Sequence, residues 1–176
     1  RFISRISDRS HNFISCEDAD AAALSRTKAA LGSMNDPYLY CQWHYFNDGN
    51  APFERDWVPV LAVADVNCAD AWKLCTGDPS IIVAVLDEGV MYDHPDLAAN
   101  MWVNEAEEMG ASTDADGNGY NGDRYGYNFA SGTGNIIYNS VYDIGHGTHV
   151  AGTIAAVNNN GIGVSGIAGG DGSPDS

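Results

Sequence analysis

The sequence predicts an α/β fold, in which helices alternate with the strands of a mostly parallel sheet. Residues 81–86 read Ile-Ile-Val-Ala-Val-Leu, and such continuous apolar runs rich in β-branched residues are typical of strands buried on both faces. We expect one helix before this strand, from Asn67 to Thr76, and another well after it, from His146 to Val157. A helix, a buried strand, a long connection and a second helix together indicate the α/β class.

The two helices are predicted from their end signals and from the spacing of their apolar residues. Asn67 is a good N-cap for the first helix, and Gly77 is a good stop. In the second helix Val150, Ile154 and Val157 fall on one stripe, which we expect to face the core. The same helix contains small residues that allow another element to approach closely, namely Gly147, Ala151, Gly152 and Ala155.

Length and composition limit the classes of protein to consider. A chain of 176 residues fits one ordinary domain or part of a larger one, and its composition, 44% hydrophobic and 18% charged, is globular. The net charge of −16 makes nucleic acid and anionic membranes poor partners. The longest strictly apolar run, residues 81–86, is far shorter than the ~20 residues of a membrane span, so none is predicted. The chain begins with Arg1 and no apolar leader, so we expect any secretion signal to be removed or left out.

Residues 1–33 differ in composition from the rest and are predicted to be an amino-terminal extension or linker. A helix is expected over about residues 17–31, because the segment is rich in alanine and has acidic residues in its first turn. Gly32 and Ser33 then end this helix. We expect residues 34–176 to belong to the folded domain, because the composition turns aromatic and acidic there.

The four cysteines show no C-x-x-C pair, which argues against a zinc or redox motif. Cys68 and Cys75 lie on the first expected helix, where a rise of 1.5 Å per residue places their Cα atoms ~10 Å apart. That separation exceeds the ~7 Å limit for a disulfide, so we interpret both as core residues. A bridge between Cys16 and Cys41 stays open.

Two residues stand where catalytic groups often lie in α/β proteins. Asp87 follows the expected strand directly, and functional groups collect at the carboxyl ends of parallel strands. His146 stands at the start of the second helix, where the helix dipole disfavours imidazolium and favours a neutral histidine able to act as a base. By position alone, Asp87 is equally compatible with a turn-forming cap, and an isolated histidine is more often structural than catalytic.

Three motifs in order carry a resemblance to a known family. Residues 82–90 read Ile-Val-Ala-Val-Leu-Asp-Glu-Gly-Val, residues 94–97 read His-Pro-Asp-Leu, and residues 146–154 read His-Gly-Thr-His-Val-Ala-Gly-Thr-Ile. In this order they resemble the subtilisin-like serine proteases (subtilases), over roughly residues 35–170. The resemblance implies a three-layer subtilisin-like fold with a mostly parallel sheet, of which only the amino-terminal half is present.

The resemblance also implies a peptidase that cleaves protein or peptide substrates with an Asp-His-Ser triad. By matching position, Asp87 resembles the triad aspartate, His146 the triad histidine, and His149 a second, non-catalytic histidine. The family's Gly-Thr-Ser-Met-Ala segment is expected beyond Ser176, so this chain alone is predicted to be inactive and to need the remaining carboxyl-terminal half of the domain. Glu88 departs from the small residue usual in the family, and strand alternation leads us to expect it to face away.

A calcium loop is predicted over residues 114–123, Asp-Ala-Asp-Gly-Asn-Gly-Tyr-Asn-Gly-Asp. Oxygen groups at positions 1, 3 and 5, a glycine at position 6 and a carbonyl at position 7 match the first half of an EF-hand loop. Position 12 is Tyr125 instead of glutamate. The alternative is an acidic, glycine-rich turn without metal. The expected ligands are Asp114, Asp116, Asn118, Tyr120 and Asp123.

A second calcium site follows only from the resemblance, which implies that it ties the start of the domain to the loop after the catalytic helix. Six oxygens with two carboxylates suit a hard cation such as calcium. The alternative is a polar loop braced by ordinary hydrogen bonds. The implied ligands are Asp36, Asp96, the Asn160 side chain and the carbonyls of Val157, Ile162 and Val164.

Two weaker patterns are set aside. Residues 161–166 spell G-x-G-x-x-G, but they follow a helix and lack the strand–turn–helix setting of a dinucleotide site. Asp143, His146 and His149 are spaced by threes, but no H-E-x-x-H motif supports zinc hydrolysis.

The sequence therefore favours a secreted, periplasmic or cell-surface serine endopeptidase, in keeping with the family's usual location, the acidic composition and the structural calcium. The alternative from another class is a non-catalytic, calcium-stabilised module with the same fold. The family resemblance also makes residues 1–33 a candidate remnant of a propeptide.

Overall fold

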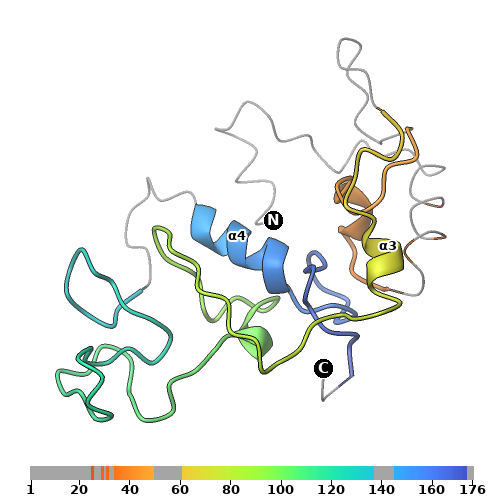
Figure 1. Ribbon diagram of the computed structural model, residues 1–176. Coiled ribbons are helices and arrows are strands. Elements are labelled where there is room, and N and C mark those ends of the chain that lie inside the picture. The colour runs from red at the N-terminus through yellow and green to blue at the C-terminus, as the bar shows by residue number, and fades with distance from the viewer. Residues whose placement is uncertain are drawn as a thin grey trace.

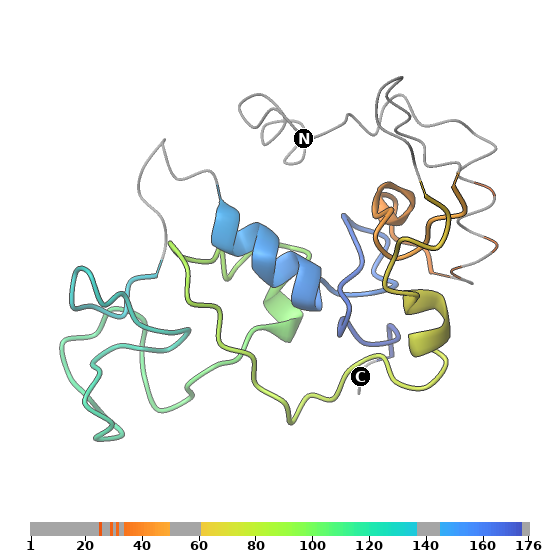
Figure 2. The same cartoon turned by 45° about the horizontal axis from the view of Figure 1, so that its top comes forward.

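The computed structural model describes residues 25, 29, 31, 34–49, 61–136 and 145–173, and regular elements are few among them. With bounds inside the described ranges there are two α-helices, α3 (Cys68–Ala71) and α4 (His146–Ala155), and two 3-10 helices, η2 (Leu39–Cys41) and η3 (Ala98–Asn100). Figures 1 and 2 show α4 across the middle, with α3 and residues 34–49 to one side and residues 105–136 to the other. None of the described helices is long and apolar enough to span a membrane.

The expected strand at residues 81–86 does not form. The described part of the chain contains no sheet, only isolated bridges between Arg124 and Gly126 and between Asn128 and Thr133. Four of the large side chains expected to be buried are exposed, from 54% at Val83 to 91% at Leu86, and Val85 alone of the large ones is half-buried, against the core beside α4. A parallel strand is stabilised by hydrogen bonds to neighbours on its flanks, and no described segment pairs with this run. The predicted parallel sheet is thus absent from the described residues.

Helix α3 is shorter than predicted. It ends at Ala71 instead of Thr76, and Asn67 adopts a left-handed conformation (φ 52°) without a capping side-chain bond. Asp65 accepts the Asn67 N–H instead, at 2.8 Å. Because the chain leaves the helix after one turn, only one of the two cysteines expected in the core is there: Cys68 is buried, and Cys75 is exposed.

The cysteines agree with the sequence on one point. Cys68 and Cys75 are free thiols, as their predicted separation required. Cys41 is disulfide-bonded, whereas Cys16 lies outside the described residues. The helix expected at residues 17–31 also lies largely outside them, although Ser25, Ala29 and Leu31 are helical.

Helix α4 begins at His146 as predicted and ends at Ala155, two residues early. Gly145 precedes it in a left-handed conformation (φ 73°) that glycine adopts without strain. The buried face consists of Gly147, Thr148, Ala151 and Gly152, three of which are among the small residues expected to allow close approach. The expected stripe of Val150, Ile154 and Val157 is only half-buried. Close backbone approach, more than large apolar side chains, therefore fixes the position of α4.

Two small cores flank α4. One contains Val90, Leu97, Ala151 and Ala156, and it packs the segment after Asp87 against the helix. The other contains Leu31, Leu39, Tyr45 and Cys68. Hydrogen bonds link the second core to α4 and to the chain after it: the Tyr45 hydroxyl donates to the Thr153 carbonyl (3.2 Å) and the Ser165 carbonyl (2.9 Å).

Candidate active site and cation-binding loops

Asp87 and His146 come together at the start of α4, although 59 residues separate them in sequence. The Asp87 Oδ2 and His146 Nδ1 atoms lie 2.8 Å apart. The Asp87 side chain is 17% exposed, and the His146 ring is 63% exposed. One edge of the imidazole thus faces a carboxylate, while most of the ring remains accessible.

The Asp87 carboxylate is held in its ionised form. Its Oδ1 accepts the Glu88 backbone N–H at 2.8 Å. This hydrogen bond is the main reason that the pKa of Asp87 is lowered, and the hydrogen bond and charge of His146 lower it further against desolvation. An ionised carboxylate at Nδ1 fixes the imidazole tautomer.

Glu88 does not face away, as strand alternation led us to expect. Its Oε1 accepts the backbone N–H of His146 at 2.7 Å. The expectation failed because residues 87 and 88 form a bend and Gly89 has a φ of 137°, so the alternation of a strand does not apply. Both carboxylates of the Asp-Glu pair therefore contact the same histidine.

The segment around Asp87 lies directly against the first turn of α4, at the lighter blue end of the helix in Figures 1 and 2. A Cβ built at Gly147 would overlap the Gly89 carbonyl oxygen and lie 3.1 Å from the Asp87 Cβ. The Met91 N–H also donates to the Thr148 Oγ1 at 2.9 Å. The glycine of the His-Gly-Thr-His motif therefore permits the approach that brings the two side chains together.

His149 lies one turn along α4 from His146. Burial is the first cause of its lowered pKa, and the charge of His146 adds to the effect. Burial likewise lowers the pKa of His44, with a further contribution from His149. Asp143, the third residue of the discounted zinc pattern, lies outside the described residues.

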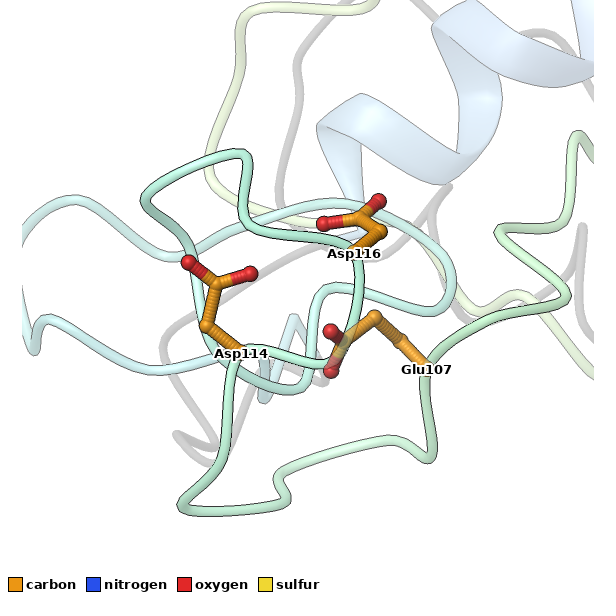
Figure 3. Close-up of side chains that lie close together, drawn as sticks. All are labelled: Glu107, Asp114 and Asp116. Carbon is orange, nitrogen blue, oxygen red and sulfur yellow. The ribbon is translucent and has the colours of Figure 1, made fainter.

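Asp114 and Asp116 form a cluster with Glu107, a residue from outside the predicted loop. One carboxylate oxygen from each lies within 4.8 Å of the others, and Figure 3 shows the three side chains around a common space. Glu107 is 1% exposed. Its oxygens accept the N–H groups of Ala115 and, at 2.8 Å, Gly122. A buried carboxylate thus reaches this loop, whose twelfth position lacks one.

The other predicted loop residues form a hydrogen-bond network beside this cluster. The Asn118 amide donates to Asp116 (3.2 Å) and to Asp123 (3.0 Å), and the buried Asn104 amide donates to the same two carboxylates. These bonds join the carboxylates of Asp116 and Asp123 through the two amide groups. Tyr120 contributes its N–H to the Asn118 Oδ1, and its ring lies outside the network at 41% exposure.

Sequence reasoning missed Glu107 and Asn104. Both lie in the segment 104–108, Asn-Glu-Ala-Glu-Glu, which has no ligand spacing of its own. The available signal was the missing glutamate at position 12 of the loop, because a strong calcium loop needs a further carboxylate from somewhere. The sequence alone does not say which of the nearby acidic residues supplies it.

The residues of the second implied site also come together. Asp36 and Asp96 are buried, at 4% and 2% exposure. Asp36 accepts hydrogen bonds from the Asn159 N–H (3.0 Å) and the Ser165 hydroxyl (2.6 Å). Asp96 accepts the Asn160 amide (2.7 Å). Burial raises the pKa of Asp96, and the nearby charge of Asp36 raises it further against the hydrogen bonds that lower it.

The three implied carbonyls lie on the loop that carries Asn160. Within the described ranges, no backbone N–H donates to the carbonyl oxygens of Val157, Ile162 or Val164. The Val157 N–H donates to the Asp96 carbonyl (2.9 Å), and the Val164 N–H donates to the Asp96 Oδ2 (2.9 Å). The loop is therefore braced by ordinary hydrogen bonds, and it also presents oxygens suited to a hard cation.

Comparison with known proteins identifies relatives of this chain. Residues 78–170 match the model of the Subtilase family. Subtilisin-like protease 1 of Plasmodium vivax is 46% identical over 154 residues, which cover 87% of this chain and 21% of that protein. Human neuroendocrine convertase 2 is 35% identical over 77% of this chain and 17% of its own length. The halolysin-like extracellular serine protease Nep of Natrialba magadii is 33% identical over 70% of this chain and 21% of its own length. The chain thus spans about a fifth of the length of these relatives.

Proposed function

Because this chain belongs to the subtilase family, a family of serine peptidases with an α/β fold, we propose that Asp87 and His146 are two members of an Asp-His-Ser triad. The observation that carries the proposal is the 2.8 Å contact between the Asp87 Oδ2 and the His146 Nδ1. The reaction is hydrolysis of a peptide bond by acyl transfer, and the substrates are proteins or peptides.

The geometry supports a definite division of roles. The Nδ1 of His146 faces an ionised carboxylate, so Nδ1 carries the proton and Nε2 keeps its lone pair. Nε2 is on the other side of a ring that is 63% exposed, where it can take a proton from an approaching hydroxyl. Asp87 holds the tautomer and stabilises the imidazolium that forms when the hydroxyl attacks the peptide carbonyl. His146 then protonates the leaving amine.

The serine belongs to the remaining carboxyl-terminal part of the domain, which is this chain's main partner. The 176 residues contain no Gly-Thr-Ser segment. Without a nucleophile the pair has no hydroxyl to activate, so the isolated chain is inactive towards peptides. The exposed run at residues 81–86 supports such a partner, because contiguous apolar surface of this kind is usually covered in a stable protein.

Calcium is the proposed structural cofactor, and it binds at two places. In the loop site Asp114, Asp116 and the buried Glu107 supply carboxylates, while Asn118, Asp123 and the Tyr120 carbonyl complete the set. In the second site Asp36, Asp96 and the Asn160 side chain join the Val157, Ile162 and Val164 carbonyls. The oxygen-only donor sets are those that calcium prefers, and the ion supplies charge neutralisation for the buried acids there.

The protein is proposed to act outside the cytoplasm, as a secreted, periplasmic or cell-surface enzyme. One relative carries the description extracellular in its name, and calcium sites of modest affinity fill in calcium-rich surroundings. A non-catalytic, calcium-stabilised module remains the second candidate. The cluster around Glu107 favours it, because that cluster serves stability whether or not a serine is present.

A fluorophosphonate probe that reacts with activated serines tests the triad in the full-length protein. Wild type and the control Asp70→Asn, a change at an exposed residue of α3, are expected to be labelled at the same rate. The His146→Ala variant is expected to be labelled at least about a thousand times more slowly, because no base activates the hydroxyl. Equal labelling of wild type and His146→Ala would remove the catalytic role, and no labelling of wild type would favour the non-catalytic module.

A further inference from the structure

The first turn of α4 lacks a side-chain cap of its own. The residue before the helix is Gly145, which has no side chain and makes no capping bond. The first N–H groups of a helix have no partner inside it and are commonly satisfied by a nearby acceptor. The backbone N–H of His146 is satisfied by the Glu88 carboxylate, which comes from 58 residues earlier in the chain.

Glu88 contacts both members of the catalytic pair at once. Its backbone N–H donates to the Asp87 Oδ1 (2.8 Å), and its side chain accepts the His146 N–H (2.7 Å). The first contact orients the carboxylate, and the second fixes the backbone from which the imidazole projects. The neighbouring contacts of Gly147 with Gly89 hold the two segments at one separation but fix neither side chain.

We propose that Glu88 is a positioning residue for the proposed peptidase reaction. Glu88 acts by holding the His146 backbone in place beside the Asp87 carboxylate. The inference rests on the proposed function of this pair. Glu88 is exposed, so solvent screens its charge. Its effect therefore comes from the hydrogen bond, and the length of the side chain matters more than its charge.

Three substitutions in the full-length enzyme separate length from charge. Glu88→Gln keeps the length and an accepting oxygen but removes the charge, Glu88→Asp keeps the charge but is one methylene shorter, and Glu88→Ala removes both. We expect Glu88→Gln to retain most of kcat, and Glu88→Asp and Glu88→Ala each to lose about fivefold in kcat. This loss corresponds to the free energy of losing one helix cap. KM for a peptide substrate should not change, because Glu88 acts through His146. Asp70→Asn, at an exposed residue on α3, is the control.

A spectroscopic readout accompanies the kinetics and does not depend on activity. The amide proton resonance of His146 should move upfield in Glu88→Asp and Glu88→Ala, which lose the acceptor. It should stay near its wild-type position in Glu88→Gln. An active Glu88→Asp enzyme beside an impaired Glu88→Gln enzyme would overturn the proposal, because the charge of Glu88 would then be the cause of its effect on kcat. Wild-type kinetics in all three variants, equal losses in all three, or a change confined to KM would also overturn it.

The same assay distinguishes this proposal from the proposed function. If wild-type enzyme is inactive, or if Asp87→Asn is as active as wild type, the triad assignment fails, and the amide resonance alone then decides whether Glu88 holds the helix. If Asp87→Asn is inactive while the Glu88 variants match wild type in kinetics and in the amide resonance, only the positioning role fails.

Discussion

At the scale of single residues, the ionisation of Asp87 depends more on the backbone than on its histidine partner. The largest contribution to its lowered pKa is the Glu88 N–H, ahead of the hydrogen bond and charge of His146. A carboxyl group whose pKa is lower in the folded than in the unfolded protein stabilises the fold at every pH above its unfolded pKa. This stabilisation is lost as the pH falls through the folded pKa. Asp87 therefore stays ionised throughout the neutral range, where its Oδ2 lies 2.8 Å from the His146 Nδ1.

This order of causes predicts the outcome of a pH titration of Asp87. Followed by the NMR signal of its carboxyl carbon, Asp87 in the wild-type protein should titrate below the ordinary value of about 3.9. In His146→Ala the midpoint should rise but remain below that value, because the Glu88 N–H is still present. An ordinary midpoint in His146→Ala would show that the histidine is the main cause.

At this scale the sequence singled out Asp87 and His146 because both stand in short, specific motifs. The structure brings their side chains into contact, and their catalytic role stays a prediction. Glu107 was not found, and Glu88 was expected to face away. The orientation of Glu88 was inferred from a strand that does not form, and the role of Glu107 depends on a turn that folds its carboxylate back to a loop seven residues later.

At the scale of elements, α4 was predictable and the strand was not. A helix forms its backbone hydrogen bonds within one segment, so its start at His146 can be read from local sequence. A strand needs partners from other segments, and in the described chain residues 81–86 have none. The buried face of α4 was predicted only in part: the small residues that allow close approach were read from the sequence, whereas the contact of Gly147 with Gly89 is set by the neighbouring chain.

Two glycine-to-alanine substitutions in α4 test the importance of this close approach. Gly147→Ala should separate the 87–89 segment from the helix, because the new Cβ would overlap the Gly89 carbonyl. Gly152→Ala is the matched control, since its Cβ would meet nothing within 4 Å, and alanine should stabilise the helix by up to about 1 kcal/mol. Thermal unfolding should show a lower Tm for the first and an equal or higher Tm for the second. A Gly147→Ala protein as stable as wild type would contradict this account of the packing.

At the scale of the whole molecule, both small apolar cores and hydrogen-bonded polar loops stabilise the fold. The two apolar clusters contain four buried residues each, whereas buried polar residues include Asp36, Asp96, Glu107 and Asp123. Buried carboxylates are stable only when they are hydrogen-bonded or neutralised. Because the net charge is −16, a bound divalent cation should stabilise the folded protein.

Calcium is accordingly expected to raise the unfolding temperature of the full-length protein by mass action, equivalent to about 2.7 kcal/mol at a hundredfold excess over Kd. Glu107→Gln should reduce this calcium-dependent increase, since it removes a carboxylate from the cluster. Glu105→Gln is the control: the Glu105 side chain is 81% exposed and pairs with Arg124 at 3.5 Å. An unchanged response to calcium in Glu107→Gln would exclude this cluster as a calcium site.

The most direct test of the central claim is the steady-state hydrolysis of a peptide by the full-length Asp87→Asn enzyme, beside wild type and Asp70→Asn. A loss of about 10⁴-fold in kcat is expected for Asp87→Asn, which is the general magnitude for serine proteases that lose the triad carboxylate. Asp70→Asn should match wild type. Retention of wild-type kcat by Asp87→Asn would show that the carboxylate facing His146 takes no part in peptide hydrolysis.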